Sequence, residues 1–198
     1  MGPSLGDGRL VLASASPRRA DLLAKARIQF EVVMPEGHEE SPSPLLDPHE
    51  LPLEMARAKA RSVKARLGKT SSPIMGCDTI VLLDDEVLGK PASSEDAKRM
   101  LRALSGRWHE VVTGVCVIAG STELVESEVT EVQFAPLSED EIESYVASGE
   151  PFDKAGAYGV QGGASLFVKG LRGPLDNVIG LPVRLVRQML AKIETVVV

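Results

Sequence analysis

Residues 10–19 read Leu10-Val11-Leu12-Ala13-Ser14-Ala15-Ser16-Pro17-Arg18-Arg19, an apolar run that leads into two serines, a proline and an arginine pair. The run predicts a buried strand, and Ser16 followed by Pro17 predicts the first turn of a helix, where the missing proline N–H costs nothing. A helix N-terminus presents free N–H groups, and the two guanidiniums add positive charge. The stretch predicts an anion site suited to a polyphosphate. The alternative is a capped helix whose arginines are solvated or ion-paired.

Further strands follow this strand-turn-helix start. The apolar segment 30–34 predicts a second strand, so the first three elements read as a β-α-β unit with a site at the end of its first strand. Later strands are predicted at 74–83, 86–88, 108–119, 124–134 and 166–169. Because hairpins and crossovers coexist, we expect an α/β or α+β fold around a mixed sheet.

Helices are predicted between these strands. One runs from residue 51 or 53 to 67, and one covers 182–193; two more open at Ser93 and Ser138, each with an acidic residue three positions on that predicts a capping box. In the helix that ends at 67, Met55, Ala58, Ser62 and Ala65 define one face, and Lys59 lies beside it.

Composition narrows the class of protein. At 198 residues and 43% hydrophobic, the chain can form one well-packed domain or two lobes that share a sheet. A formal net charge of −6 argues against a nucleic-acid or membrane-surface protein. The two cysteines, Cys77 and Cys116, form no disulfide framework, and no segment reads as a signal peptide or membrane span, so we expect a cytoplasmic protein. Residues 1–9 are expected to be a flexible extension.

A carboxylate and a hydroxyl interrupt the strand at 74–83. Asp78 is followed by Thr79 in an otherwise apolar run, and a buried aspartate is costly unless it is paired, hydrogen-bonded or bound to metal. A catalytic or metal-binding role and a structural role at the strand end both remain open. Glu39 and Glu40, in the long loop 35–52, are either solvated charges or, beside Asp78, part of an oxygen site for Mg²⁺.

Two further segments could carry chemistry. Lys90 stands between Gly89 and Pro91, which fixes its direction, although a plain surface turn has the same pattern. The glycine-rich stretch 150–163 has the pattern of neither a helix nor a regular strand; its glycines permit close backbone approach, and its Gln161 can both donate to and accept from a base or ribose. By contrast, the histidines lack zinc spacing and are expected in loops or at the surface, with His109 on a strand face.

Six motifs occur together and in order. They are Ser14-Ala15-Ser16-Pro17-Arg18-Arg19, Gly76-Cys77-Asp78-Thr79-Ile80-Val81, Gly89-Lys90-Pro91, Leu104-Ser105-Gly106, Phe152-Asp153-Lys154-Ala155-Gly156-Ala157-Tyr158-Gly159-Val160-Gln161-Gly162 and Asn177-Val178-Ile179-Gly180-Leu181-Pro182. From Leu10 to Ile193 the chain thus resembles the Maf family of nucleoside triphosphate pyrophosphatases. The resemblance implies one domain over 10–198 with a mixed sheet bent between two lobes, similar to inosine triphosphate pyrophosphatases. It also implies hydrolysis of a nucleoside triphosphate to the monophosphate and pyrophosphate with a divalent cation, Mg²⁺ or Mn²⁺.

The resemblance also implies a role for each matching residue. Asp78 would be the proton acceptor and, with Glu40, a metal ligand; because the loop carries an extra Pro-Ser-Pro segment, Glu39 is the alternative to Glu40. The residues that would bind substrate or its phosphates are Ser14, Arg18, Arg19, Lys59, Thr79, Lys90, Asp153, Lys154 and Gln161.

Specificity and partners follow from the same resemblance. Thr79, where other members have glutamine, and the wording from Lys154 to Gln161 resemble the subgroup that acts on dTTP and UTP. Alternatives are a pyrophosphatase for 7-methyl-GTP or another modified nucleotide, and a nucleotide-binding regulator of cell division. We expect no nucleic-acid polymer or membrane as partner, and homodimers occur in the family.

Overall fold

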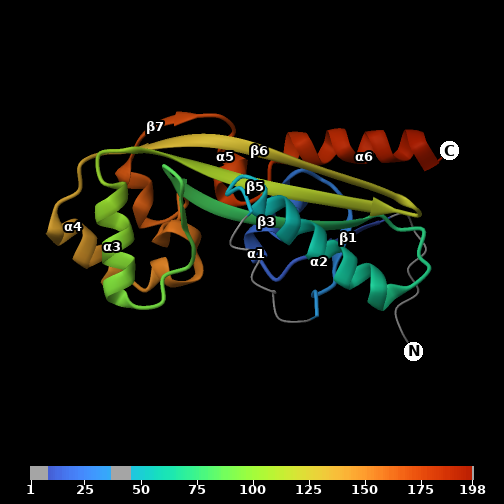
Figure 1. Cartoon of the computed structure of the whole chain (residues 1–198), viewed down its shortest axis with the longest axis horizontal. Helices are drawn as coiled ribbons and strands as arrows, with labels where there is room; N and C mark the ends of the chain where they lie inside the picture. The colour runs from blue at the N-terminus through green and yellow to red at the C-terminus, as the bar shows by residue number, and fades with distance from the viewer. Residues whose placement is uncertain (1–8, 37–45, 198) are drawn as a thin grey trace. The chain divides into compact units, whose positions relative to one another are not determined.

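The opening strand lies between two parallel neighbours, so the predicted β-α-β unit is confirmed. The computed structural model describes residues 9–36 and 46–197, and Figure 1 follows the chain through them. The strands are β1 (Leu10–Ala13), β2 (Phe30–Val32), β3 (Ile74–Leu83), β4 (Glu86–Leu88), β5 (Trp108–Ala119), β6 (Thr122–Phe134) and β7 (Val168–Arg172). The helices are α1 (Pro17–Lys25), α2 (Leu51–Leu67), α3 (Ser94–Leu104), α4 (Glu139–Ala147), α5 (Leu175–Ile179) and α6 (Val183–Val197).

The sheet is mixed, as expected. Its strand order is β2-β1-β3-β5-β6-β7, with β4 paired to β3. The pairs of β1 with β2 and β3 are parallel, whereas β3 pairs with β4 and β6 with β7 in antiparallel fashion. No helix among the described residues is long and apolar enough to cross a membrane.

The chain divides into two units. Unit 1 contains the described residues up to Asp78, together with 113–128 and those from Gly180 on, and unit 2 contains 79–112 and 129–179. The long strands β3, β5 and β6 contribute residues to both units. Because three strands run through both units, we propose that residues 10–198 form a single domain.

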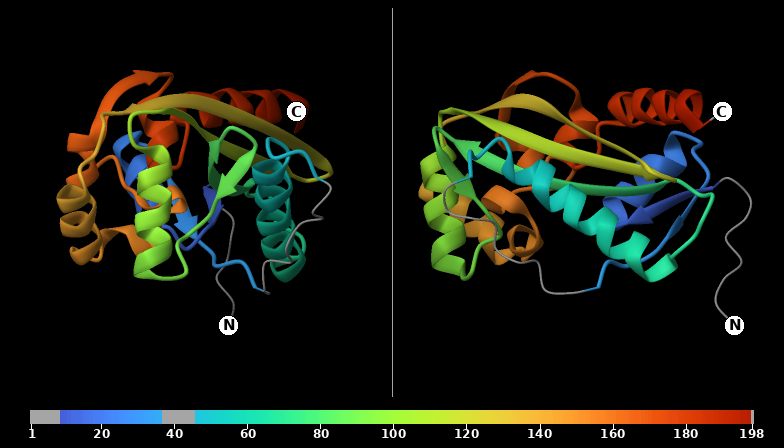
Figure 2. Two further views of the ribbon diagram at one scale, coloured as in Figure 1. Left: turned by 60° about the vertical axis from the view of Figure 1, so that its left-hand side comes forward. Right: turned by 45° about the vertical axis from the view of Figure 1, so that its right-hand side comes forward.

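In unit 1, strand alternation sends side chains to two helical layers. Leu12, Met75 and Cys77 pack in one core with α1 and α6 residues, whereas Val11 and Ile74 pack in another with α2. Because successive strand residues point to opposite faces, α2 covers one face of these strands and α6 the other, as Figure 2 shows. This layering decides which side chains can meet α2.

The face of α2 that the sequence analysis singled out is not the face that packs against the sheet. Ala56, Ala60 and Val63 are buried, whereas Ala58 and Ala65 are exposed. The helix is rich in alanine on several sides, so its own pattern does not favour one face strongly. Two strand glycines decide it: a Cβ on Gly76 would meet the backbone at Ala56 and Ala60, and one on Gly114 would meet the backbone at Pro52 and Leu53. The helix therefore packs closely against the strands through its smallest residues.

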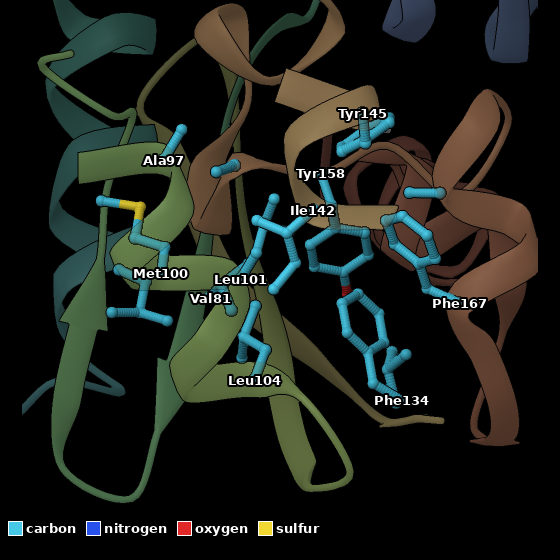
Figure 3. Close-up of a cluster of buried hydrophobic side chains, with 14 of the residues drawn as sticks. Val81, Ala97, Met100, Leu101, Leu104, Phe134, Ile142, Tyr145, Tyr158 and Phe167 are labelled. Carbon is cyan, nitrogen blue, oxygen red and sulfur yellow. The ribbon is translucent and has the colours of Figure 1, made fainter. Parts of the chain in front are cut away.

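Unit 2 has its own core. Its cluster joins α3 and α4 residues to Phe134, Tyr158 and Phe167, and Figure 3 shows these rings side by side. Each ring packs edge-on against the next, with centroids 4.8 Å apart for Phe134 and Tyr158 and 5.9 Å apart for Phe134 and Phe167. His109 lies on strand β5, as expected, but it is buried beside this cluster and not at the surface.

Several local predictions are corrected in unit 2. The capping box of Ser138 and Glu141 forms as predicted. At Ser93, the side-chain oxygen accepts from the Asp96 N–H, but the Asp96 carboxylate accepts from the N–H of Ala92 and not from that of Ser93. Only half of this second box therefore forms. The predicted strand at 166–169 begins two residues later, because 163–167 form a turn of 3₁₀ helix. The glycine-rich stretch contains two more such turns, at 150–153 and 155–157, and is neither a regular helix nor a strand, as predicted. Helix α5 lacks a signal in the sequence.

Candidate active site

Asp78 lies on the face of β3 that meets α2. Since Ile74 and Gly76 both contact α2, strand alternation points Asp78 to the same side. The Lys59 ammonium on α2 lies 2.6 Å from Asp78 Oδ1, and the two side chains are only 13% and 17% exposed. This is the charge-assisted pair that a carboxylate in an apolar strand requires. Lys59 fixes one oxygen of Asp78.

The start of α1 carries the predicted anion-binding residues. Arg19 is 8% exposed, and its Nε donates to the Gly180 carbonyl oxygen at 2.9 Å. One terminal nitrogen of Arg19 donates to Ser14 Oγ at 3.0 Å, and the Ser16 N–H donates to the same oxygen at 3.2 Å. Arg19 therefore stabilises the turn after β1 in addition to carrying a positive charge. The preceding residue, Arg18, is partly buried.

Ser16 occupies the N-cap position of α1 but does not cap it through its side chain. Pro17 takes the first helical position, as predicted. Without a side-chain cap, the following N–H groups of this nine-residue helix keep their preference for an anion. An anion site at residues 14–19 remains a proposal, and the absence of a Ser16 side-chain cap fits it.

In unit 2, the glycine-rich stretch folds around Glu150. The Lys154 ammonium donates to the Glu150 carbonyl and to Asp153 Oδ1, each at 2.6 Å. The Gly163 N–H donates to the Glu150 carboxylate at 3.1 Å. Sequence analysis missed Glu150, because a glutamate after a helix-ending glycine gives no signal of its role.

Two more bonds fix this stretch. The Gly159 N–H donates to the Tyr145 hydroxyl at 3.1 Å, and the Gly156 N–H donates to the carbonyl of Gly89 at 3.0 Å. The second bond ties the stretch to the residue before Lys90. The side chains of Lys90 and Gln161 are exposed, and Thr79 is partly buried. Unit 2 thus brings together Lys154, Asp153 and the Gly89–Lys90 turn.

The predicted metal ligands are only partly described. Glu40, like its alternative Glu39, lies outside the described residues, and within 9–36 and 46–197 no group of three or more His, Cys, Asp or Glu could hold a metal. Asp78 offers carboxylate oxygen, the donor that Mg²⁺ and Mn²⁺ prefer, and Mg²⁺ typically needs only one or two carboxylates beside substrate oxygens. The chemistry of Asp78 fits such an ion.

Cys77 belongs to the core, as predicted. It points away from Asp78 into the cluster with α1 and α6, and burial raises the pKa of its thiol to about 11. A thiol with this pKa is a poor nucleophile at neutral pH. Asp78, paired with Lys59 of α2, therefore remains the candidate reactive group of this strand.

Comparison with known proteins gives a consistent result. The profile of the family described as "Maf-like protein" matches residues 9–193. A protein named dTTP/UTP pyrophosphatase from Thermococcus kodakarensis is 48% identical over 177 residues, covering 89% of this chain and 93% of the relative. Its namesake from Koribacter versatilis is 47% identical over 192 residues, covering 96% of each, and that from Bacillus cereus is 44% identical over 182 residues, covering 91% and 94%.

Proposed function

The chain belongs to the Maf family, and from that premise we propose that it hydrolyses dTTP and UTP to the nucleoside monophosphate and pyrophosphate. The family match over residues 9–193 and three relatives named dTTP/UTP pyrophosphatase, at 44–48% identity, support this reaction. Its role is removal of nucleotides from the cellular pool.

In this reaction the Asp78 carboxylate is the general base. It accepts a proton from a water molecule as the water oxygen bonds to the α-phosphorus and the bond to the bridging oxygen breaks, releasing pyrophosphate. Lys59 orients the carboxylate through the 2.6 Å bond. Proton transfer to a positioned base contributes roughly 10²–10⁴-fold.

The remaining polar residues bind the triphosphate and the nucleoside. Ser14, Arg18 and Arg19, at the N-terminus of α1, hold phosphate oxygens, and Lys90 adds a cation. Asp78 with Glu40 would hold a divalent cation, Mg²⁺ or Mn²⁺, which would supply charge neutralisation for the phosphates.

Pyrimidine preference rests on unit 2. Thr79 and the stretch from Lys154 to Gln161 bind the nucleoside, and Asp153 also binds the substrate. A site that hydrogen-bonds one base edge strongly rejects a base lacking the matching groups. An apolar pocket in general rejects an extra methyl group only weakly. Hence dTTP and UTP differ little as substrates, and purines are rejected.

The test is pyrophosphate release by the purified protein over a panel of dTTP, UTP, CTP, ATP, GTP and 7-methyl-GTP, with Mg²⁺ and with Mn²⁺. We expect the highest kcat/KM for dTTP and UTP. A purine or 7-methyl-GTP as best substrate contradicts the specificity. If no nucleotide in the panel is turned over, the reaction itself is wrong and a nucleotide-binding regulator of cell division remains.

The setting of the enzyme is also proposed. Cys77 and Cys116 are both free and buried, which fits a reducing cytoplasm. We propose that neither a nucleic-acid polymer nor a membrane is a partner, and that the chain forms a homodimer. Sedimentation measures the last point, and a monomer at micromolar concentration contradicts it.

A further inference from the structure

His109 is a buried histidine that the proposed reaction does not use. It lies on β5, is 3% exposed, and packs edge-on against Phe134 and Tyr158 with centroids 5.0 and 5.4 Å away. Burial lowers its pKa to about 4, so the ring is neutral at pH 7. An apolar residue would fill such a place at lower cost, because a buried polar ring must find a partner.

The partner of His109 is the hydroxyl of Tyr158, 2.8 Å from Nε2. The other nitrogen, Nδ1, is buried without a hydrogen-bond partner among the described residues. The ring therefore makes one polar contact there, and that contact joins a regular strand of the sheet to the middle of the glycine-rich stretch.

The backbone beside Tyr158 is strained. Gly156 and Ala157 have φ of 67° and 58°, and a side chain at positive φ is unfavourable for alanine. Such a conformation persists only when the surroundings over-determine it. Here Tyr158 follows directly, with its ring in the aromatic cluster of Figure 3 and its hydroxyl on His109.

The same stretch carries Lys154 on one side of Tyr158 and Gln161 on the other. Lys154 already depends on Glu150 for its direction, and Gly159 depends on Tyr145. Those bonds are local to α4 and the stretch itself. The Tyr158 hydroxyl bonds to a residue on a long sheet strand, which is a more rigid anchor than a turn.

We propose that His109 is a positioning residue for nucleotide binding: through Tyr158 it holds the stretch 154–161 in the conformation in which Lys154 and Gln161 meet the nucleoside. The inference rests on the proposed function. It adds a residue outside the motifs of the family resemblance, and it assigns His109 no contact with substrate.

Two matched variants test it. Glutamine places its amide nitrogen as many bonds from Cα as histidine Nε2, whereas asparagine places it at the position of Nδ1, out of reach of Tyr158. We expect His109→Asn and Tyr158→Phe each to raise KM for dTTP about tenfold, the equivalent of one buried hydrogen bond, with kcat within about threefold of wild type. His109→Gln keeps KM within about threefold. Loss of folded protein alone lowers kcat and leaves KM unchanged, so the split separates positioning from instability.

Amide hydrogen exchange of the free protein provides a readout that needs no substrate. In His109→Asn, residues 154–163 exchange faster than in wild type, and those of α3 (Ser94–Leu104) do not. If His109→Asn fails to fold, Tyr158→Phe carries both measurements. Unchanged KM overturns the proposal even if exchange is faster, since the bond is then merely structural. Equal impairment of the glutamine and asparagine variants also overturns it. A wild-type protein without turnover refutes the proposed function instead, and exchange alone then decides whether His109 anchors the stretch.

Discussion

Replacing Gly76 by alanine tests whether close packing of α2 on β3 sets the geometry of the Asp78–Lys59 pair. A Cβ at this position would lie 2.7 Å from the Ala60 backbone nitrogen, and closer still to the carbonyl oxygen of Ala56. Both are helix backbone atoms and cannot rotate away. Since ordinary contacts between such atoms are about 3.5 Å, α2 must withdraw by about 1 Å.

Two consequences follow for Gly76→Ala. Overpacking of this kind costs about 1–3 kcal/mol, which for a protein of this size lowers Tm by about 2–12 °C. Because Lys59 lies on α2, the same withdrawal lengthens its 2.6 Å contact with Asp78. A catalytic group misplaced by about 1 Å can lose on the order of 10²-fold in rate, so we expect kcat to fall about 10–100-fold.

The assay combines thermal unfolding with pyrophosphate release from dTTP, measured well below the Tm of the variant. Gly89→Ala is the control for unfolding, because a Cβ there has nothing within 4 Å and its φ is not positive. The control is expected to keep the wild-type Tm. The reasoning is refuted if Gly76→Ala unfolds within about 1 °C of wild type, or if it is destabilised yet keeps the wild-type kcat.

Three further predictions test the site and the core. Asp78→Asn is expected to lower turnover of dTTP by at least about 10²-fold while nucleotide binding persists, and a residual rate above about a tenth rules out a general base. Arg18→Ala and Arg19→Ala are expected to lose about 1.5–3 kcal/mol of transition-state binding in kcat/KM, and Arg19→Ala also lowers Tm because it releases the Ser14 and Gly180 bonds; unchanged kcat/KM in both contradicts the phosphate role. The pKa of His109 is about 4 when folded and 6.5 when unfolded, so the unfolded state binds the proton first and stability falls as pH drops from 6.5 towards 4. Urea unfolding at pH 7 and pH 4.5 measures this decline, and His109→Gln is expected to flatten it; an equal decline in both proteins assigns it to other groups.

The amino-acid sequence by itself determined most of the strands and the family. The bounds of β1, β3 and β5 are the predicted ones, because long apolar runs ended by turns or polar residues leave few alternatives. The sequence also indicated the importance of Asp78, because a carboxylate inside an apolar strand needs a partner or a function whatever the rest of the fold. Lys59, by contrast, came from the family resemblance alone, since an isolated lysine on a helix carries no such signal.

Only the tertiary structure decided which residues meet. The face of α2 depends on Gly76 and Gly114, two glycines on separate strands, and no pattern within the helix encodes them. Likewise, the burial of His109 depends on Tyr158, 49 residues further along the chain. Hydrophobic periodicity reports how a residue relates to its own helix or strand, whereas close packing and buried hydrogen bonds depend on the path of the whole chain. The pairing of Asp78 with Lys59 likewise depends on the path of the whole chain. The two side chains meet because the small residues of α2 pack directly against the glycine at position 76 of β3.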